Sequence, residues 1–351
     1  MSTLATNAIT DASGGNTTTI NGFTPTVSNM AGRNKIINGD MRISQRGTSF
    51  ANVVSQYTLD RWKVYRSGTA EYTVTQSSDA PDGFANSLRL DCSTVDDTVD
   101  ISDYSILQYN IEGLDLQQLN YGRASALTKT LSFWVKSNVT GIVTVSSELN
   151  IGPPFLSQDF TIYAADTWEY KTLTYVGNTT TAIDNDNSCG IELQIWLNAG
   201  SNFKGGAYNS STWHSTGADR VNPSNINISG STSNYFQITG VQLEAGSVAT
   251  PFEYRQYGQE LALCQRYYEQ YDGVIYPIDV NLPDTSHTIH MAFSERKRSA
   301  PTITLGSGTN LDVLYARTDH DQTHGVGITT SHSSNSQGKI ESPAWIASAE
   351  L

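Results

Sequence analysis

Alternation of apolar and polar residues in many short segments is the feature that most constrains the fold of this chain. The pattern recurs in residues 61–65, 71–75, 87–92, 130–136, 141–145, 168–174, 191–197 and 236–243. Turn residues such as Pro81-Asp82-Gly83 separate these segments. A period of two buries one face of a strand and leaves the other face in water. The number and spacing of the segments therefore predict a two-sheet jelly-roll β-sandwich.

The composition agrees with an all-β chain. Charged residues make up only 16% of the 351 residues, and Ser, Thr, Asn and Gly take their place. Ser, Thr and Asn compete with the helical backbone for hydrogen bonds, so they suit strands better than long helices. Aromatic residues reach 10%, which is enough to build a core and argues against a fully disordered chain.

One helix is expected at residues 257–271. Leu261, Cys264, Tyr268 and Tyr271 follow one another at steps of three, four and three residues, which is the a/d spacing of a heptad. Two heptads are too few to decide between two structures. Either a single helix packs on its own domain, or three chains form a short helical neck.

The chain divides into four parts on composition and pattern. Residues 1–34 are an extended arm in which Asp11 and Arg33 are the only ionisable side chains, and it is either disordered or ordered by a partner. Residues 35–256 form the sandwich, and residues 257–271 are a helical connector. Residues 272–351 form a small C-terminal β domain with expected strands at residues 274–278, 287–293, 301–305, 311–315, 325–329 and 345–347. About 80 residues give a thin core, which three intertwined copies would thicken.

Several classes of protein are excluded by charge and motif. The net charge is −13 and no basic patch is present, which argues against a nucleic-acid partner. No apolar run approaches the roughly 20 residues of a membrane span, and the N-terminus lacks the pattern of a signal peptide. Cys92, Cys189 and Cys264 form no C-x-x-C pair, so we expect free thiols and synthesis in a reducing cytoplasm.

No catalytic or cofactor motif is found, and we expect neither an enzyme, nor a cofactor, nor a metal site. The strongest candidates for receptor contact combine an aromatic side chain with polar ones: Tyr315, Asp319, His320, Asp321 and His324 near the C-terminus, and Trp213 with His214 in a long loop of residues 199–233. The 319–324 segment is open to other interpretations. It is a polar loop, a receptor-contact loop, or a metal site within one chain or on a three-fold axis.

Four segments of the chain resemble a known family. They are NKIINGDMRISQR (residues 34–46), YTLDRW (57–62), ITGVQLEAGSVATPFEYR (238–255) and ELALCQRYY (260–268). This set resembles the jelly-roll, carbohydrate-binding-module-like tail fibre or virion structural proteins of tailed bacteriophages, of the marine and cyanobacterial type. The resemblance covers roughly residues 1–271. No sugar-binding motif of the family can be matched, so the resemblance transfers no binding residue.

The resemblance implies a homotrimeric virion protein, made in the host cytoplasm. Residues 1–34 would attach it to a tail or capsid protein, and the C-terminal domain would bind a glycan or protein of the bacterial surface. Three weak contacts in a trimer gain avidity from their linkage. Two alternatives stay open: a structural protein that binds no receptor, such as a head fibre, capsid decoration or tail adaptor, and a glycan-degrading tailspike.

Overall fold

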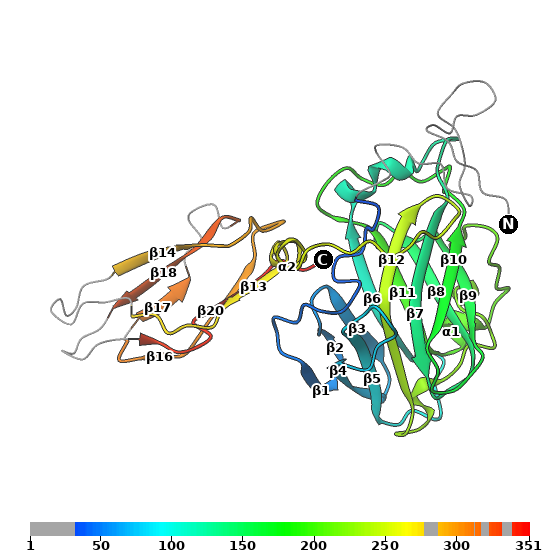
Figure 1. Cartoon of the computed structure of the whole chain (residues 1–351), viewed down its shortest axis with the longest axis horizontal. Coiled ribbons are helices and arrows are strands. Elements are labelled where there is room, and N and C mark those ends of the chain that lie inside the picture. Colours follow the sequence, from blue (N-terminus) through cyan, green and yellow to red (C-terminus); the bar gives the residue numbers. More distant parts are fainter. Residues whose placement is uncertain (1–31, 277–286, 312, 317–322, 332–338) are drawn as a thin grey trace, which may run out of the picture.

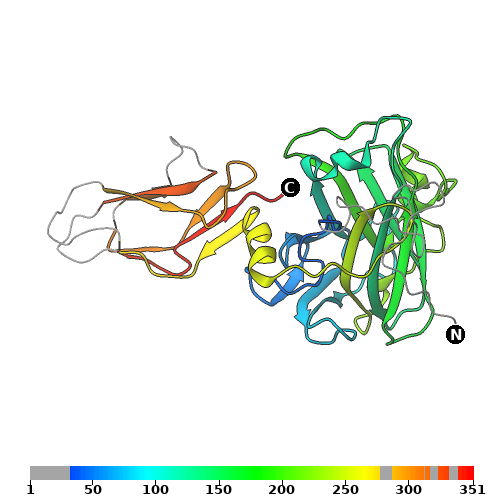
Figure 2. The ribbon, with the colours of Figure 1, turned by 45° about the horizontal axis from the view of Figure 1, so that its top comes forward.

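The computed structural model describes residues 32–276, 287–311, 313–316, 323–331 and 339–351. A large β-sandwich occupies one end of the molecule, and a group of small sheets at the other end contains the C-terminal strands (Figure 1). The short helix α2 (Tyr257–Gln265) lies between them, as the view in Figure 2 also shows. Among the helices that the structure describes, none is long and apolar enough to cross a membrane.

Two six-stranded antiparallel sheets form the sandwich, which confirms the predicted fold class. The first, here called the β12 sheet, has the order β1 (Ser49–Val53), β4 (Glu71–Ser77), β5 (Ser87–Thr94), β12 (Tyr235–Ala245), β7 (Lys129–Ser137) and β10 (Glu169–Tyr175). The second, the β11 sheet, has the order β2 (Ser55–Tyr57), β3 (Trp62–Ser67), β6 (Tyr104–Glu112), β11 (Cys189–Ala199), β8 (Gly141–Leu149) and β9 (Phe155–Ile162).

The core lies between the sheets and is built by alternate residues of their strands. Leu131, Phe133 and Val135 of β7 share one buried cluster with Leu193 and Ile195 of β11. Each such side chain contributes about 1.5–3 kcal/mol when it is fully buried. Short helices interrupt the connections: η1 (Gly113–Leu119), α1 (Ser201–Lys204), η2 (Gly217–Asp219) and η3 (Ile228–Gly230), the last three within the predicted long loop.

The C-terminal strands form three small sheets. They are β13 (Tyr268–Tyr271), β20 (Trp345–Ser348) and β15 (Thr302–Leu305); β14 (His287–Ala292), β18 (Gly325–Ser331) and β17 (Val313–Ala316); and β16 (Gly308–Thr309) with β19 (Lys339–Ile340). Trp345, Ile328 and Phe293 belong to their shared core. The strand predicted at residues 274–278 is wrong in its described part, because Ile275 forms only an isolated bridge with Ile340. Residues 277–278 lie outside the described residues.

The predicted helix at residues 257–271 is wrong beyond Gln265. Tyr268 and Tyr271 lie on β13, whose backbone pairs with β20, so long-range pairing overrides the helical pattern. Cys264 is fully buried, and it packs in the same cluster as Leu261. The four residues therefore share no helical face, and a neck built on their heptad spacing is not formed. The homotrimer itself stays a prediction.

A buried glutamate joins the sandwich to the C-terminal sheets. The Glu350 carboxylate pairs with Arg46 at 2.9 Å and also with Arg61. Arg61 is buried: its guanidinium donates to the Asn110 carbonyl at 2.6 Å, and its Cζ lies 3.5 Å from the centre of the Tyr267 ring. Removing one partner of such a buried pair leaves an uncompensated charge, so this contact fixes how the two parts meet.

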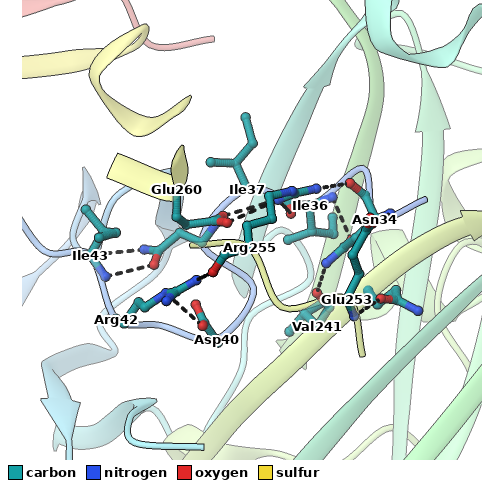
Figure 3. A network of polar contacts seen from close by, with 12 residues as sticks. Asn34, Ile36, Ile37, Asp40, Arg42, Ile43, Val241, Glu253, Arg255 and Glu260 are labelled. Atoms are coloured by element: carbon teal, nitrogen blue, oxygen red, sulfur yellow. Dashed lines mark hydrogen bonds and ion pairs between the residues drawn. The ribbon is translucent and has the colours of Figure 1, made fainter. Parts of the chain in front are cut away.

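Residues 32–43 cross the end of β12 and form what we call the N-terminal joint (Figure 3). The Asn34 side chain accepts from the backbone N–H groups of Ile36 (2.9 Å) and Leu243 (3.1 Å) and donates to the Val241 carbonyl (3.1 Å). The Asn34 backbone N–H donates to the Glu253 carboxylate at 2.8 Å. One amide side chain thus satisfies backbone groups from segments about 200 residues apart in the sequence.

A second asparagine, Asn38, stabilises the rest of the joint through its side-chain amide. The Asn38 side chain donates to the carbonyls of Ile43 (2.8 Å) and Asp60 (3.0 Å) and accepts from the Ile43 N–H (2.9 Å). Glu260 accepts from the Asn38 N–H, and Arg255 lies 3.3 Å from the same carboxylate. These residues belong to the segments that carry the family resemblance. Their role in this chain is to hold the N-terminal segment, β12 and α2 together.

The joint predicts a strict requirement for glycine at position 39. A Cβ on Gly39 would lie 2.2 Å from the Val241 carbonyl oxygen. The Val241 N–H also donates to the Gly39 carbonyl at 2.9 Å. We expect Gly39→Ala to lower the free energy of unfolding by about 2 kcal/mol or more, because backbone must move on both sides. Gly152→Ala is the matched control, since its Cβ would meet nothing within 4 Å. Urea unfolding measures both variants, and equal stabilities would contradict this account of the joint.

Candidate functional site

The residues predicted near the C-terminus are only partly described. Asp319, His320 and Asp321 lie outside the described residues, and Tyr315 lies on β17. His324 is exposed, with its Nδ1 3.3 Å from the hydroxyl of Thr323. Trp213 and His214 belong to the sandwich, so the two predicted groups lie on different parts of the molecule. Receptor contact through the 319–324 loop stays a prediction.

A groove lies on the outer face of the β11 sheet. We call it the β11 groove; its volume is about 500 Å³. The strand register sets its floor in three rows that cross β3, β6, β11 and β8. The rows are Tyr65, Ile106 and Trp196; Lys63, Gln108 and Gln194; and Asn110, Glu192 and Glu148. Successive rows are two residues apart along each strand, or about 7 Å.

One end of the groove is aromatic. The ring centres of Tyr65 and Tyr104 lie 5.7 Å apart, and Tyr104 contacts Trp196 (6.2 Å) and Phe203 of α1 (5.2 Å). Trp196 is buried and packs against Tyr104 and Phe203, and its indole N–H donates to the Ser146 hydroxyl at 2.9 Å. Tyr65 is 40% exposed. Tyr65 and Tyr104 therefore present ring surface to a ligand, and the buried tryptophan supports Tyr104.

The rest of the floor is rich in hydrogen-bond acceptors. The Gln194 amide N–H groups donate to Glu148 at 3.1 Å and to Glu192, and the Gln108 amide donates to Asn110 at 3.2 Å. The side-chain oxygens of Gln108 and Gln194 are buried without a hydrogen-bond partner among the described residues. An unsatisfied buried acceptor is unfavourable by about 1–3 kcal/mol. Both residues line the groove, and a ligand hydroxyl could donate to these oxygens if the side chains turned toward it.

Two basic and two acidic side chains line the groove, but they are not equally free to contact a ligand. Arg220 lies 2.9 Å from Glu148 and is engaged by it. Lys63 lies at the aromatic end, with its Nζ 4.9 Å from the centre of the Tyr65 ring. Burial raises the pKa of Glu192, the neighbouring Glu148 raises it further, and the Gln194 amide opposes the shift. Across the described residues, no group of three or more His, Cys, Asp or Glu side chains could hold a metal ion.

Sequence reasoning missed this groove. Residues 61–65 and 191–197 were expected to be strands, and Glu192, Gln194 and Trp196 do alternate along one of them. The strand between them, β6, was not expected, so nothing indicated that Gln108 and Asn110 stand beside this face. The signal was the outward set of amide, carboxylate and aromatic side chains on a single strand.

Comparison with known proteins gives distant similarity of fold. No protein-family model matches the chain, and no curated protein matches its sequence. The enzymatically active domain of tailspike protein 4 of bacteriophage CBA120 is 16% identical over 60% of this chain, with a TM-score of 0.34. This chain covers 21% of that tailspike chain.

Carbohydrate-binding modules show similarity at the same level. The family 11 module of a Clostridium thermocellum cellulase is 11% identical, with a TM-score of 0.28 over 58% of this chain and 98% of the module. The CBM22-1 xylan-binding domain of Paenibacillus barcinonensis Xyn10C is 11% identical, with a TM-score of 0.26 over 57% of this chain and 95% of the domain. The chain thus has a β-sandwich distantly similar to these modules, and the similarity identifies no ligand.

Trp213 and His214 hold the long loop to the sandwich. The Trp213 indole N–H donates to the Val176 carbonyl at 3.0 Å, and its ring stands edge-on to Tyr121 at 5.9 Å. His214 exchanges two backbone hydrogen bonds of 2.9 Å with Phe155, and their rings lie 5.0 Å apart. Neither residue lines the β11 groove. Their contact with a receptor stays a prediction.

Beneath Trp213 lies a lysine that is fully buried. The Lys129 ammonium donates to the Tyr121 hydroxyl at 3.0 Å and lies 4.9 Å from the ring centres of both Tyr175 and Trp213. Aromatic faces attract a cation, which partly offsets the cost of burying it. Burial nevertheless lowers the pKa of Lys129 to about 7. The cost of the buried charge makes stability depend on pH.

Whether stability rises or falls with pH depends on how many protons the folded and the unfolded chain bind. The ordinary pKa of a lysine is 10.5, so between pH 7 and 10.5 the unfolded chain keeps a proton that folded Lys129 has lost. Lys129 therefore makes the free energy of unfolding increase as the pH rises from 7 to 10.5. We expect Lys129→Met to remove this rise and to add about 1 kcal/mol or more at pH 7. Urea unfolding between pH 7 and 9 tests it, with the half-buried Lys204→Met as control. Unchanged pH dependence in Lys129→Met would contradict the pKa shift.

Proposed function

We propose that this chain is a glycan-binding virion protein of a tailed bacteriophage, a tail fibre or spike subunit that holds a host surface glycan in the β11 groove. The observation that carries the glycan-binding part is the three-row floor, in which an aromatic row stands beside a row of amides and a row of carboxylates. Specific ligand sites combine an apolar surface with a few placed polar groups in this way.

The two ends of the groove suit the two kinds of surface on a sugar. A pyranose ring has a face of C–H groups that packs against an aromatic ring, and Tyr65 and Tyr104 offer such rings. The same sugar carries hydroxyl donors around its edge. Gln108 and Gln194 lack donors for their side-chain oxygens, and Glu192 is a further acceptor in the next row. Amide and carboxylate oxygens can each accept more than one hydrogen bond.

The charges of the floor favour a neutral glycan. Glu148 and Glu192 would repel an acidic sugar at the polar end. Arg220 is already paired with Glu148, which leaves Lys63 at the aromatic end as the lining cation not bound to a lining carboxylate. Like-charge contact in a partly buried site lowers affinity for the wrong ligand and so contributes to specificity.

The virion location is supported by the sequence resemblance. The four segments that carry it build the N-terminal joint and α2, which hold together the part of the molecule from which the N-terminal arm departs. In this proposal the arm binds a tail or capsid protein, and the sandwich presents the groove. In this proposal the groove binds the glycan without hydrolysing it.

Substitution of groove residues tests the glycan proposal. We expect the full-length chain to bind a neutral polysaccharide on a glycan array, and Tyr65→Ala or Gln108→Leu to weaken that binding about tenfold, because each removes one contact of about 1–2 kcal/mol. Tyr163→Ala is the control, since this tyrosine is highly exposed and does not line the groove. Titration calorimetry with the selected oligosaccharide gives the affinities.

Three outcomes of that experiment would contradict the proposal. The full-length chain binds no glycan, or the groove variants bind as tightly as the control, or acidic polysaccharides bind better than neutral ones. Release of shorter sugars from the bound polysaccharide would instead indicate a degrading spike.

The trimer is tested by mass in solution. Fibre and spike subunits of the kind that this chain resembles are homotrimers, so we expect light scattering of the full-length protein to give three times the chain mass of 38.2 kDa. A trimer would raise avidity without any change in the groove. The mass of a single chain at every concentration tested would contradict a self-assembled spike and favour a decoration protein.

A further inference from the structure

A second groove lies on the outer face of the β12 sheet. We call it the β12 groove; it also has a volume of about 500 Å³. Trp134 and Tyr170 stand side by side in it with ring centres 5.4 Å apart. Phe84 and Phe252 form another wall, 5.2 Å apart, and Tyr254 packs on both of them. Tyr170 and Tyr254 are about half exposed, so the groove is open to a ligand.

The chemistry of this groove differs from that of the β11 groove. None of its lining residues carries a carboxylate, an ammonium or a guanidinium group. Two of its polar side chains are engaged: the Thr250 hydroxyl donates to Glu244 at 2.7 Å, and the Tyr254 hydroxyl donates to the Gly83 carbonyl at 2.9 Å. Among the described lining residues, no buried polar atom lacks a partner. The groove therefore suits an uncharged, largely apolar segment better than a sugar.

The N-terminal arm leaves the described structure at the wall of this groove. The Arg33 guanidinium donates to the carbonyl of Pro251, a lining residue, at 3.3 Å. The Gly32 N–H donates to the Glu253 carboxylate at 2.6 Å, and Glu253 stands between the lining residues Phe252 and Tyr254 in the chain. Figure 3 shows Glu253 beside Asn34 and Val241 at the edge of β12. Residues 1–31 are thus tethered next to the groove.

The arm carries a segment whose chemistry matches the groove. Residues 23–27 read Phe-Thr-Pro-Thr-Val, so Phe23, Pro25 and Val27 alternate with threonines. Proline disfavours a helical conformation for the residue before it, which favours an extended segment here. An extended backbone places alternate residues on one face, over about 13 Å. Asp11 is the only ionisable side chain in residues 1–31, so the arm brings almost no charge.

We propose that residues 23–27 of the arm dock in the β12 groove of their own chain. Val27 is five residues from Gly32, and five extended residues span up to about 17 Å. A short tether gives an effective concentration in the millimolar range, so the chain's own arm outcompetes that of another copy at micromolar protein. Docking directs the arm over the β12 sheet, away from the β11 groove, and leaves residues 1–22 free to reach a partner. The proposal goes beyond glycan binding and does not depend on it.

Engineered disulfides in the full-length chain test the docking. The pairs are Phe23→Cys with Tyr170→Cys and Val27→Cys with Ala249→Cys; the control is Phe23→Cys with Thr174→Cys, an exposed position on β10 that does not line the groove. Cys92, Cys189 and Cys264 are buried and do not compete. Under mild oxidation we expect both groove pairs to cross-link within one chain at least fivefold faster than the control, as seen on non-reducing gels. If the Tyr170→Cys variant unfolds, the pair of Val27→Cys with Ala249→Cys still tests the docking.

Three results would overturn the proposal. Equal rates for groove and control pairs mean that the arm does not dock. Cross-linked dimers in place of a shifted monomer mean that the arm binds another copy. Control-level cross-linking together with loss of glycan binding in Trp134→Ala means that the β12 groove takes sugar. Thermal unfolding of each variant before oxidation shows that it is folded.

Discussion

The register between β6 and β11 is the constraint on which the groove depends. These strands pair from Cys189–Glu112 to Ala199–Tyr104, with shifts at both ends and an uninterrupted ladder between them. The ladder sets Gln108 beside Gln194 on the outer face and Leu107 beside Ile195 in the core. A slip of one residue would send the amides inward and the aliphatic side chains outward. Burial of the aliphatic face therefore specifies the order of the polar rows on the other face.

The N-terminal joint shows what the family-like segments of this chain do. Asn34 and Asn38 are buried, and each satisfies backbone groups of distant segments with its amide. A buried polar network is stabilising only when its members are satisfied together, so substitutions within it are poorly tolerated. None of the residues in the family-like segments lines the β11 groove, so the resemblance indicates an architecture without indicating a ligand for that groove.

Much of the sandwich could be predicted from the sequence, and the exceptions have a physical cause. Strands whose apolar and polar residues alternate in the sequence, such as β4 and β7, were found. Strand β6 also alternates from Leu107 to Glu112 and was nevertheless missed; the tail at Leu351 and the loop before β12 cover part of its outer face, so nearly every residue is buried. At residues 268–271 the helical spacing was real, but pairing with β20 decided the structure. Local pattern fails where distant backbone supplies the hydrogen bonds.

The groove was beyond sequence reasoning for the same reason. Glu192, Gln194 and Trp196 are visible on one strand, but their neighbours Gln108 and Asn110 come from about 85 residues earlier, and Arg220 comes from a loop. Which residues face one another is set by the strand order, which no local pattern encodes. The residues predicted to contact a receptor are instead aromatic and polar residues in or beside polar loops. Trp213 is an example: its ring packs on the buried Lys129, and its indole N–H holds the loop to the sandwich.

The most direct test of the account is a crystal structure of the full-length protein with a neutral oligosaccharide bound. The account predicts a pyranose ring against Tyr65 and Tyr104, with its hydroxyls donating to the side-chain oxygens of Gln108 and Gln194. A sugar bound elsewhere, for example at the loop that contains His324, with the β11 groove empty in the same crystal, would contradict it.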